Sequence, residues 1–340
     1  MAKIDFRNFW VVGLGGLFII GLIFLWVFFV GVKADKTGAF YNTGQNAVWI
    51  AHEWAEEPKN GFEIQNLVMD LSRHDIDTIF LHVGPLREDG LIAPSTYQAT
   101  VNFVDKVKRY GDNIKVLAWM GQIRGKIDLG NPQVRHNILS MCTIFVDMVG
   151  MDGVHYDIEP VWDGDEDFIA LLEETRRLFD RREELGAGRA VVSVALAEFI
   201  PSSFVWWTEE LTGFENYNTE VNYLNVAKHA DQIVDMVYDT GIDRGWLYRW
   251  LVKEQVIWVS DLIGSEEAAG TEFLIGVPTY DSGGEGFNPE VENIENAMLG
   301  ILDGLNDIRS SHENFTGIAI YSEWETSDDE WAVYDGLWNE

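Results

Sequence analysis

The chain has 340 residues, of which 47% are hydrophobic and 13% aromatic, so it can bury a large core within one domain. Asp and Glu total 56 against 24 Lys and Arg, which gives a formal net charge of −32 at pH 7. So acidic a surface repels nucleic-acid phosphates and anionic lipid headgroups, and we therefore expect no nucleic-acid partner. The single cysteine, Cys142, excludes an intramolecular disulfide and a cysteine-rich metal site.

The N-terminal region contains 24 consecutive uncharged residues, from Phe9 to Val32. At a rise of about 1.5 Å per residue, this stretch can cross a hydrocarbon layer of roughly 30 Å. We expect an N-terminal flank at 1–8, one transmembrane helix at 9–32, a polar tether at 33–46 and a large domain at 47–340. That domain is expected on the extracytoplasmic side of the membrane, as a single-pass protein anchored through its N-terminal helix.

The alternative for this region is a secretory signal peptide, cleaved after Ala34, which would release a secreted domain. Signal peptides have an apolar stretch of roughly 7 to 15 residues, and the stretch in this chain is longer. The length favours a retained anchor.

From Ala47 to the C-terminus, short apolar runs typical of strands alternate with longer helical patterns. The predicted strands are 47–51, 78–83, 115–119, 153–158, 190–196, 232–238, 273–277 and 317–321. The predicted helices between them include 63–73, 98–109, 132–149, 167–185, 246–262 and 291–308. Eight such units predict an α/β fold, a closed (β/α)8 TIM barrel, because a doubly wound sheet usually has fewer strands and a Gly-rich phosphate loop.

The fourth predicted strand carries the ionisable residues that matter most, because TIM barrels place their chemistry at the C-terminal ends of strands. Apolar residues at 154, 156 and 158 alternate with His155, Asp157 and Glu159, so the three ionisable side chains share one face. Neighbours on that face lie about 6.5 to 7 Å apart, so one carboxyl can hold a proton near neutral pH. Such a group is the general acid that a glycosidase needs, and Glu159, at the end of the strand, is the candidate. The competing interpretation is a buried ion cluster that only stiffens the barrel.

The segment 152–159 resembles the fourth-strand signature of glycoside hydrolase family 18, Asp-x-x-Asp-x-Asp-x-Glu, and matches three of its four acidic positions. This family contains chitinases and endo-N-acetylglucosaminidases. Met-Val-Tyr-Asp at 236–239 is similar to the family's sixth-strand Met-x-Tyr-Asp, and Gly-Val-Pro-Thr-Tyr at 276–280 to its seventh-strand Gly-x-Pro-x-Tyr.

The resemblance implies a retaining, substrate-assisted glycosidase in which the sugar's own 2-acetamido oxygen is the nucleophile. Glu159 would protonate the glycosidic oxygen and later act as base, while Asp157 would hold the acetamido N–H and stabilise the oxazolinium intermediate. Tyr238 would hydrogen-bond the acetamido oxygen. The mechanism implies no metal and no cofactor.

The partner implied by the resemblance is a polysaccharide or glycan that contains N-acetylhexosamine, such as chitin, peptidoglycan or an N-glycan core. The residues expected to bind it are Asp239, Met236, His155, Tyr280, Tyr321, Trp324 and Trp119.

Three positions depart from the family's pattern. His155 stands where the family has a second inward Asp, and its imidazole is expected to hydrogen-bond or pair in charge with Asp157. Tyr321 replaces a Trp that usually forms the floor under the reactive sugar. Trp119 lies where the family has a small Ser-x-Gly-Gly strand end, so the substrate is expected to differ from plain chitin.

Two alternatives remain open from the sequence. The first is a carbohydrate-binding, lectin-like barrel without catalytic activity, which the replacement at His155 favours. The second is a glycosidase with two protein carboxylates, in which Glu323 or Asp239 would be the nucleophile opposite Glu159. A carboxyl separation near 5 Å would favour the second.

Overall fold

The computed structural model describes residues 35–340 except 112, 207–209, 211–216, 269 and 282–285. The predicted membrane segment, 9–32, lies outside this part of the chain. Among the residues that are described, no helix is both long and apolar enough to span a bilayer.

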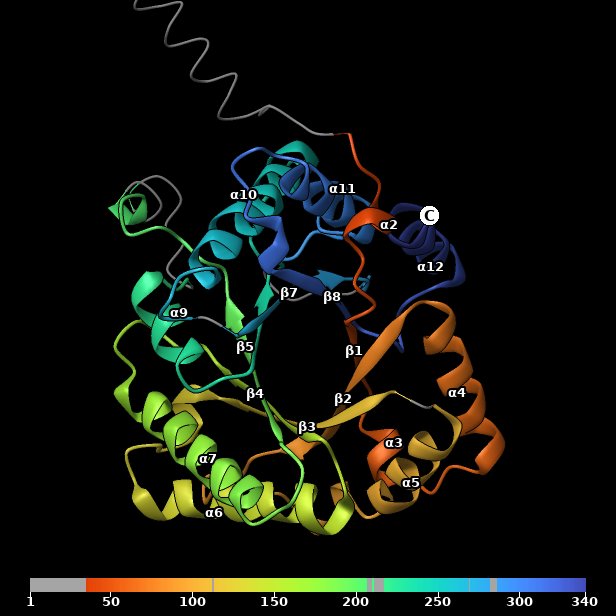
Figure 1. The fold of residues 1–340 in the computed structure, drawn as a ribbon, viewed down its shortest axis with the longest axis vertical. Coiled ribbons are helices and arrows are strands. Elements are labelled where there is room, and N and C mark those ends of the chain that lie inside the picture. The colour runs from red at the N-terminus through yellow and green to blue at the C-terminus, as the bar shows by residue number, and fades with distance from the viewer. Residues whose placement is uncertain (1–34, 112, 207–209, 211–216, 269, 282–285) are drawn as a thin grey trace, which may run out of the picture.

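Eight parallel strands form a closed barrel in which each strand pairs with the next along the chain and β8 pairs with β1 (Figure 1). The strands are β1 (Asn46–Ile50), β2 (Ile76–Pro85), β3 (Lys115–Ile123), β4 (Gly153–Glu159), β5 (Val191–Ala197), β6 (Gln232–Met236), β7 (Glu272–Pro278) and β8 (Phe315–Tyr321). This arrangement confirms the predicted (β/α)8 barrel.

Helices surround the barrel on its outside (Figure 1). Those that match predicted helices are α4 (Gly61–Arg73), α5 (Thr100–Tyr110), α6 (Pro132–Thr143), α7 (Glu166–Glu184), α10 (Gly245–Ile263) and α11 (Ile294–Leu305). Shorter helices are α2 (Gly38–Tyr41), α3 (Glu53–Glu56), α9 (Glu220–Ala227) and α12 (Asp328–Tyr334). Single 3₁₀ turns are η1 (Pro94–Thr96), η2 (Arg124–Lys126) and η4 (His312–Asn314), and short π-helical segments are η3 (Ile144–Val149) and η5 (Asp335–Asn339).

The alternation of side chains along each strand divides the core into two layers. Outward-facing residues pack under the helices, and in β4 these include Val154, Tyr156 and Ile158. Inward-facing residues fill the barrel itself, with Ala47, Trp49, Phe80, Leu117, Trp119, Val234, Leu274 and Ala319 in one cluster. The ionisable residues of β4 therefore sit on the inward face, as their alternation predicts, above and among aromatic side chains.

Residues 36–46 belong to the expected tether, 33–46, and pack against one end of the barrel. The backbone N–H of Lys36 donates to Asn306 Oδ1 at 2.8 Å, and Asn306 Nδ2 donates to the Lys36 carbonyl at 2.9 Å. The buried Tyr41 donates its hydroxyl to the same Asn306 oxygen at 3.1 Å. Asn306 directly follows α11, and Thr43 contacts the start of β8 through the Thr316 carbonyl, so this contact lies at the N-terminal ends of the strands.

Candidate active site

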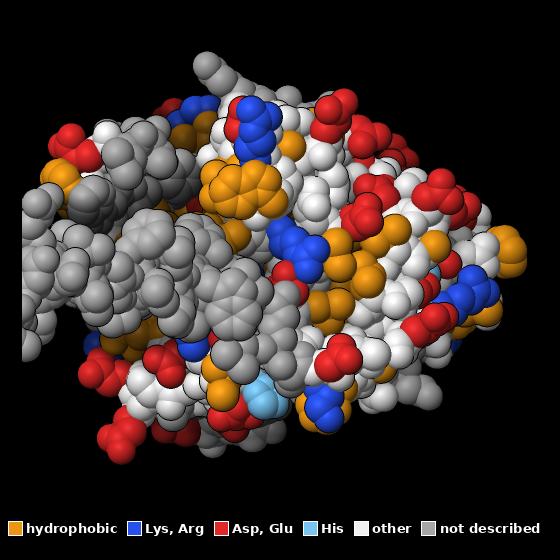
Figure 2. Space-filling view, turned by 90° about the horizontal axis from the view of Figure 1, so that it is seen from above, with side chains coloured by type: hydrophobic (Ala, Val, Ile, Leu, Met, Phe, Trp, Pro, Cys, Tyr) orange, Lys and Arg blue, Asp and Glu red, His pale blue; other side chains and the backbone are white. Residues whose placement is uncertain are grey.

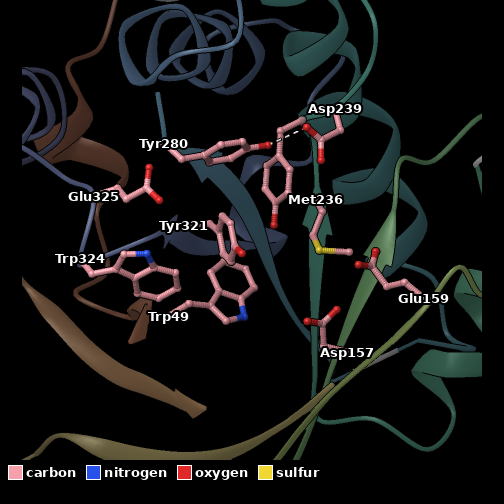
Figure 3. A pocket seen from close by; sticks show the side chains of 10 residues that line it. Trp49, Asp157, Glu159, Met236, Asp239, Tyr280, Tyr321, Trp324 and Glu325 are labelled. Carbon is pink, nitrogen blue, oxygen red and sulfur yellow. Dashed lines mark hydrogen bonds between the residues drawn. The ribbon is translucent and has the colours of Figure 1, made fainter. Parts of the chain in front are cut away.

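A pocket of about 250 Å³ opens at the C-terminal ends of the strands. Its lining residues are Trp49, Asp157, Glu159, Met236, Tyr238, Asp239, Tyr280, Tyr321, Trp324 and Glu325. Figure 3 shows the carboxyl groups of Asp157 and Glu159 on one side of the pocket and the rings of Trp49, Tyr321 and Trp324 on the other. The structure thus brings eight of the ten predicted site residues together in one pocket; Trp119 and His155 lie outside its lining.

The two carboxyls of β4 share one buried environment. Burial raises the pKa of Glu159 well above its usual range, and the nearby negative charge of Asp157 raises it further. Burial also raises the pKa of Asp157, but a hydrogen bond from Trp119 opposes that effect. Because like charges in one buried site resist joint ionisation, the pair favours a proton on Glu159 and the negative charge on Asp157.

The two oxygens of Asp157 differ in their partners. The indole Nε1–H of Trp119 donates to Asp157 Oδ2 at 2.7 Å. Asp157 Oδ1 is buried and makes no hydrogen bond to any residue that the structure describes. A buried acceptor without a partner is costly, so this oxygen is suited to receive an N–H or O–H from a bound molecule.

His155 does not contact Asp157 by a hydrogen bond, which corrects the expected pairing of these two residues. Its Nε2 lies 3.1 Å from the indole Nε1 of Trp49, and its Nδ1 lies 2.8 Å from Ser193 Oγ. Both ring nitrogens are therefore engaged below the pocket, where the imidazole stacks on Phe80 with ring centroids 3.9 Å apart. Burial lowers the pKa of His155 to about 3, so the ring is neutral and cannot form a charge pair.

The residues after β6 form a second polar wall. Asp239 adopts a φ of 60°, in the left-handed region that a non-glycine residue seldom occupies. The hydroxyl of Tyr280 donates to Asp239 Oδ1 at 2.8 Å and so fixes the carboxylate in this conformation (Figure 3). Burial raises the pKa of Tyr238 well above its usual range, so its hydroxyl stays a hydrogen-bond donor. Strained backbone of this kind is common at functional sites.

The aromatic wall combines residues from β1 and from the end of β8. The rings of Trp49 and Tyr321 meet edge to face with centroids 5.5 Å apart, and Tyr321 and Trp324 do so at 5.8 Å. Tyr321 also stacks on Tyr238 at 5.6 Å. Trp324 is 42% exposed and lies at the mouth of the pocket. Such surfaces bind the apolar faces of sugar rings. The indole of Trp49 enlarges the aromatic surface that the smaller ring of Tyr321 provides.

Sequence reasoning missed Trp49 and Glu325, which both line the pocket. Trp49 belongs to an uninterrupted buried strand, where a tryptophan is typical of core packing; its inward position on the first strand was the available signal. Glu323, by contrast, lines a neighbouring pocket of about 400 Å³ together with Trp54 and Arg73. Of the two nucleophiles considered for a two-carboxylate mechanism, only Asp239 shares the pocket of Glu159.

Within the described part of the chain, no group of three or more His, Cys, Asp or Glu side chains is placed to hold a metal ion. The polar atoms of the pocket are instead carboxyl and phenol groups, with an indole donor behind them. This set is suited to proton transfer and to hydrogen bonding with a neutral polar molecule.

Comparison with known proteins gives similarity in structure only. No model of a known protein family matches the chain, and no curated protein matches it in sequence. A family 18 chitinase from Cycas revoluta, solved in complex with (GlcNAc)3, superimposes with a TM-score of 0.60 at 11% identity, over 86% of this chain and 99% of that one.

Two further solved structures are similar over comparable lengths. A family 18 N-acetylglucosaminidase from Paenibacillus barengoltzii has a TM-score of 0.56 at 14% identity, covering 87% of this chain and 99% of its own. The Group IV chitinase of Ostrinia furnacalis has a TM-score of 0.56 at 15% identity, covering 90% of this chain and 100% of its own. At these identities the shared property is the fold, and the resemblance to family 18 chitinases is confirmed at that level.

Proposed function

We propose that the chain is a glycoside hydrolase that cleaves β-linked N-acetylhexosamine polymers with retention of configuration, Glu159 acting as general acid and base. The observation that carries this proposal is the carboxyl pair at the end of β4. One member is protonated by burial and by its neighbour's charge, and the other keeps a free acceptor oxygen.

The chemistry follows from these two groups. Glu159 gives its proton to the glycosidic oxygen as the bond from that oxygen to C1 breaks. The oxygen of the sugar's 2-acetamido group bonds to C1 in the same step, on the opposite face, and forms a cyclic oxazolinium ion. Asp157 accepts the acetamido N–H on Oδ1 and stabilises the positive charge of that ion.

The second step restores the enzyme. Glu159, now ionised, takes a proton from water as the water oxygen bonds to C1 and the oxazolinium ring opens. Two displacements at C1 return the original anomeric configuration. Tyr238, a donor in the same pocket, is placed to bind the acetamido oxygen as charge develops on it.

The dimensions and the lining support a single N-acetylhexosamine unit as the occupant. A cavity of about 250 Å³ lies just below the usual range for small-molecule pockets, roughly 300 to 1,000 Å³, so it suits one sugar unit better than several. Its aromatic wall offers a face for a pyranose ring, and the carboxylates and phenols of Asp239, Tyr280 and Glu325 offer polar partners for hydroxyl groups. The polymer would extend from the mouth, where Trp324 is exposed.

From the sequence alone, we propose that residues 9–32 anchor the enzyme in a membrane as a single-pass segment, with the barrel on the extracytoplasmic side. Its support is the uninterrupted apolar stretch of 24 residues.

Hydrolysis by the full-length protein of chitin oligosaccharides and of peptidoglycan glycan strands tests the activity. Glu159→Gln keeps the shape of the side chain and removes its proton, so we expect turnover to fall at least about 100-fold. NMR of the first products should show the β-anomer.

The matched control is Glu323→Gln, a carboxyl of the neighbouring pocket, which we expect to keep its activity. An α-anomer as first product, or equal turnover in Glu159→Gln and the wild type, would contradict the mechanism. Oligosaccharide binding without cleavage in every variant would instead indicate a carbohydrate-binding barrel.

A further inference from the structure

Trp119 lies on the inward face of β3, next to the catalytic strand. In the register of β3 and β4, Trp119 pairs with His155 and Gly121 pairs with Asp157. The indole ring thus rises beside Asp157, and its Nε1–H reaches Oδ2 at 2.7 Å. Asp157 Oδ2 accepts this hydrogen bond inside the barrel, where Trp119 is only 8% exposed.

The indole is held in place from its other side. The ring of His82 on β2 packs against Trp119 with centroids 4.5 Å apart. Burial, together with the nearby His52, lowers the pKa of His82 to about 4, so this neighbour is uncharged near neutral pH. Trp119 therefore lies between a neutral ring and the carboxylate of Asp157, in an orientation that its packing fixes.

His155, directly below, is not available for the same task. The Trp49 indole is only a donor, so His155 Nε2 must accept, and the imidazole proton resides on Nδ1. That proton is donated to Ser193 Oγ, whose own hydroxyl donates to Gln232 Oε1 at 2.7 Å. This directional chain crosses the barrel beneath the pocket and uses both nitrogens of His155.

We propose that Trp119 is the positioning residue of the site: its indole N–H holds Asp157 Oδ2 and leaves Oδ1 for the acetamido N–H of the substrate. This inference rests on the proposed function and deepens it. An indole N–H can donate but can neither accept a hydrogen bond nor release its proton near neutral pH. Asp157 therefore has a partner that favours its anion and never shares a proton with it.

The groups that face Asp157 come from three strands and from the loop after β6. They are Glu159 on the same strand, Trp119 on β3, Tyr238 after β6 and Tyr321 on β8, with the neutral His155 below. Burial raises the pKa of Tyr238, and the pKa of Tyr321 is raised to about 12, so both phenols keep their protons near neutral pH. Of these groups, only Glu159 can therefore share a proton with Asp157.

The first test is Trp119→Phe, which removes the N–H and keeps an aromatic ring. We expect kcat/KM to fall about 10- to 100-fold, the range for loss of one hydrogen bond to a charged group. The lost donor raises the pKa of Asp157, which must be ionised in the reaction, so the acid limb of the pH profile should move to higher pH.

The control is Trp338→Phe, the same chemical change at a buried indole whose N–H donates to Asn46 Oδ1 at 3.1 Å, near the opposite end of the barrel. It should lower thermal stability and leave the acid limb in place. An unmoved acid limb in an active Trp119→Phe variant would overturn the proposal.

A second measurement does not depend on turnover. The indole ¹⁵N–¹H signal of Trp119, assigned by its loss in Trp119→Phe, should move with pH as the Asp157 and Glu159 pair titrates, and should shift in Asp157→Asn. A signal that responds to neither change overturns the contact itself. A responsive signal in a protein without hydrolytic activity would keep the contact and reject the proposed function.

Discussion

The imidazole of His155 is kept neutral by its surroundings. It is fully buried and stacks on Phe80, and its two ring nitrogens are hydrogen-bonded to Trp49 and Ser193. Protonation would place an unpaired charge in the centre of the barrel, which is far more costly than the hydrogen bonds it could gain. His155 therefore serves as a fixed link that holds Trp49 in the wall of the pocket, and it adds no titration to the pH range of the site.

Ser193→Ala tests this link. The change leaves the Nδ1–H of His155 buried without an acceptor, so we expect the free energy of unfolding to fall by about 1 to 3 kcal/mol in urea titrations. The control is Ser140→Ala, whose hydroxyl bonds the His136 carbonyl on an exposed helix face and should change stability little. Equal effects of the two substitutions would show that the buried chain contributes nothing to stability.

Side-chain roles were predictable from the sequence only where a motif specifies them. Asp157, Glu159 and Tyr238 stand at positions that motif and strand alternation indicate together, and all three line the pocket. Trp119 was expected to contact substrate, yet it lies behind Asp157. A strand pattern gives the face on which a residue lies, but it does not show which donor reaches which acceptor across two strands.

At the scale of elements, α10 and α11 approach closely because glycines on α11 remove side chains from the contact. A Cβ on Gly304 would lie 2.6 Å from the Cβ of Val256 and 2.9 Å from the Lys253 carbonyl. A Cβ on Gly300 would lie 2.7 Å from the Arg249 carbonyl. Backbone and Cβ atoms cannot rotate away, so an added methyl group must push the two helices apart.

We expect Gly304→Ala to lower the free energy of unfolding by about 1 to 3 kcal/mol, despite the better helix propensity of alanine. Gly336→Ala is the matched control, because a Cβ at that position would meet nothing within 4 Å. Thermal unfolding of both variants measures the difference. A Gly304→Ala variant as stable as Gly336→Ala would show that the interface can relax without cost.

Hydrophobic periodicity predicted the order and type of the elements, but it predicted the residues at which they begin and end less accurately. β2 and β3 extend beyond the predicted 78–83 and 115–119, because polar residues such as Gln122 continue the strand where the apolar pattern stops. β6 ends at Met236, two residues early, because the chain turns there to place Tyr238 and Asp239 in the pocket. The backbone of such a loop is set by the positions that its side chains take in the pocket, which hydrophobic periodicity does not show.

On the scale of the whole molecule, acidic side chains dominate both the surface and several buried positions. Figure 2 shows Asp and Glu side chains spread over the visible face, with fewer Lys and Arg among them. Inside, burial raises the pKa of Glu198 and of Asp235 well above their usual range. These carboxyls are buried where ionisation is disfavoured, so the folded state binds protons that the unfolded chain releases.

The sign of the resulting pH dependence is fixed by these raised values. A carboxyl whose folded-state pKa lies above its unfolded value contributes fully below the unfolded value, and the contribution is lost as pH rises toward the folded one. We therefore expect Asp235→Asn, which cannot ionise, to gain stability relative to the wild type as pH increases from 4 to 8. Thermal midpoints across that range measure the gain; a constant difference would show that Asp235 does not titrate between the two states.

The contact of Lys36 and Tyr41 with Asn306 holds the first described residues at the end of the strands opposite the pocket. In a molecule held by residues 9–32, the bilayer would then lie behind the barrel and the cleft would open away from it. Sugars attached to lipids of that same bilayer would be out of reach, and the substrates within reach would be polymers standing about one barrel height from the membrane. The membrane anchor proposed for residues 9–32 would thereby turn the mouth of the pocket away from the lipid.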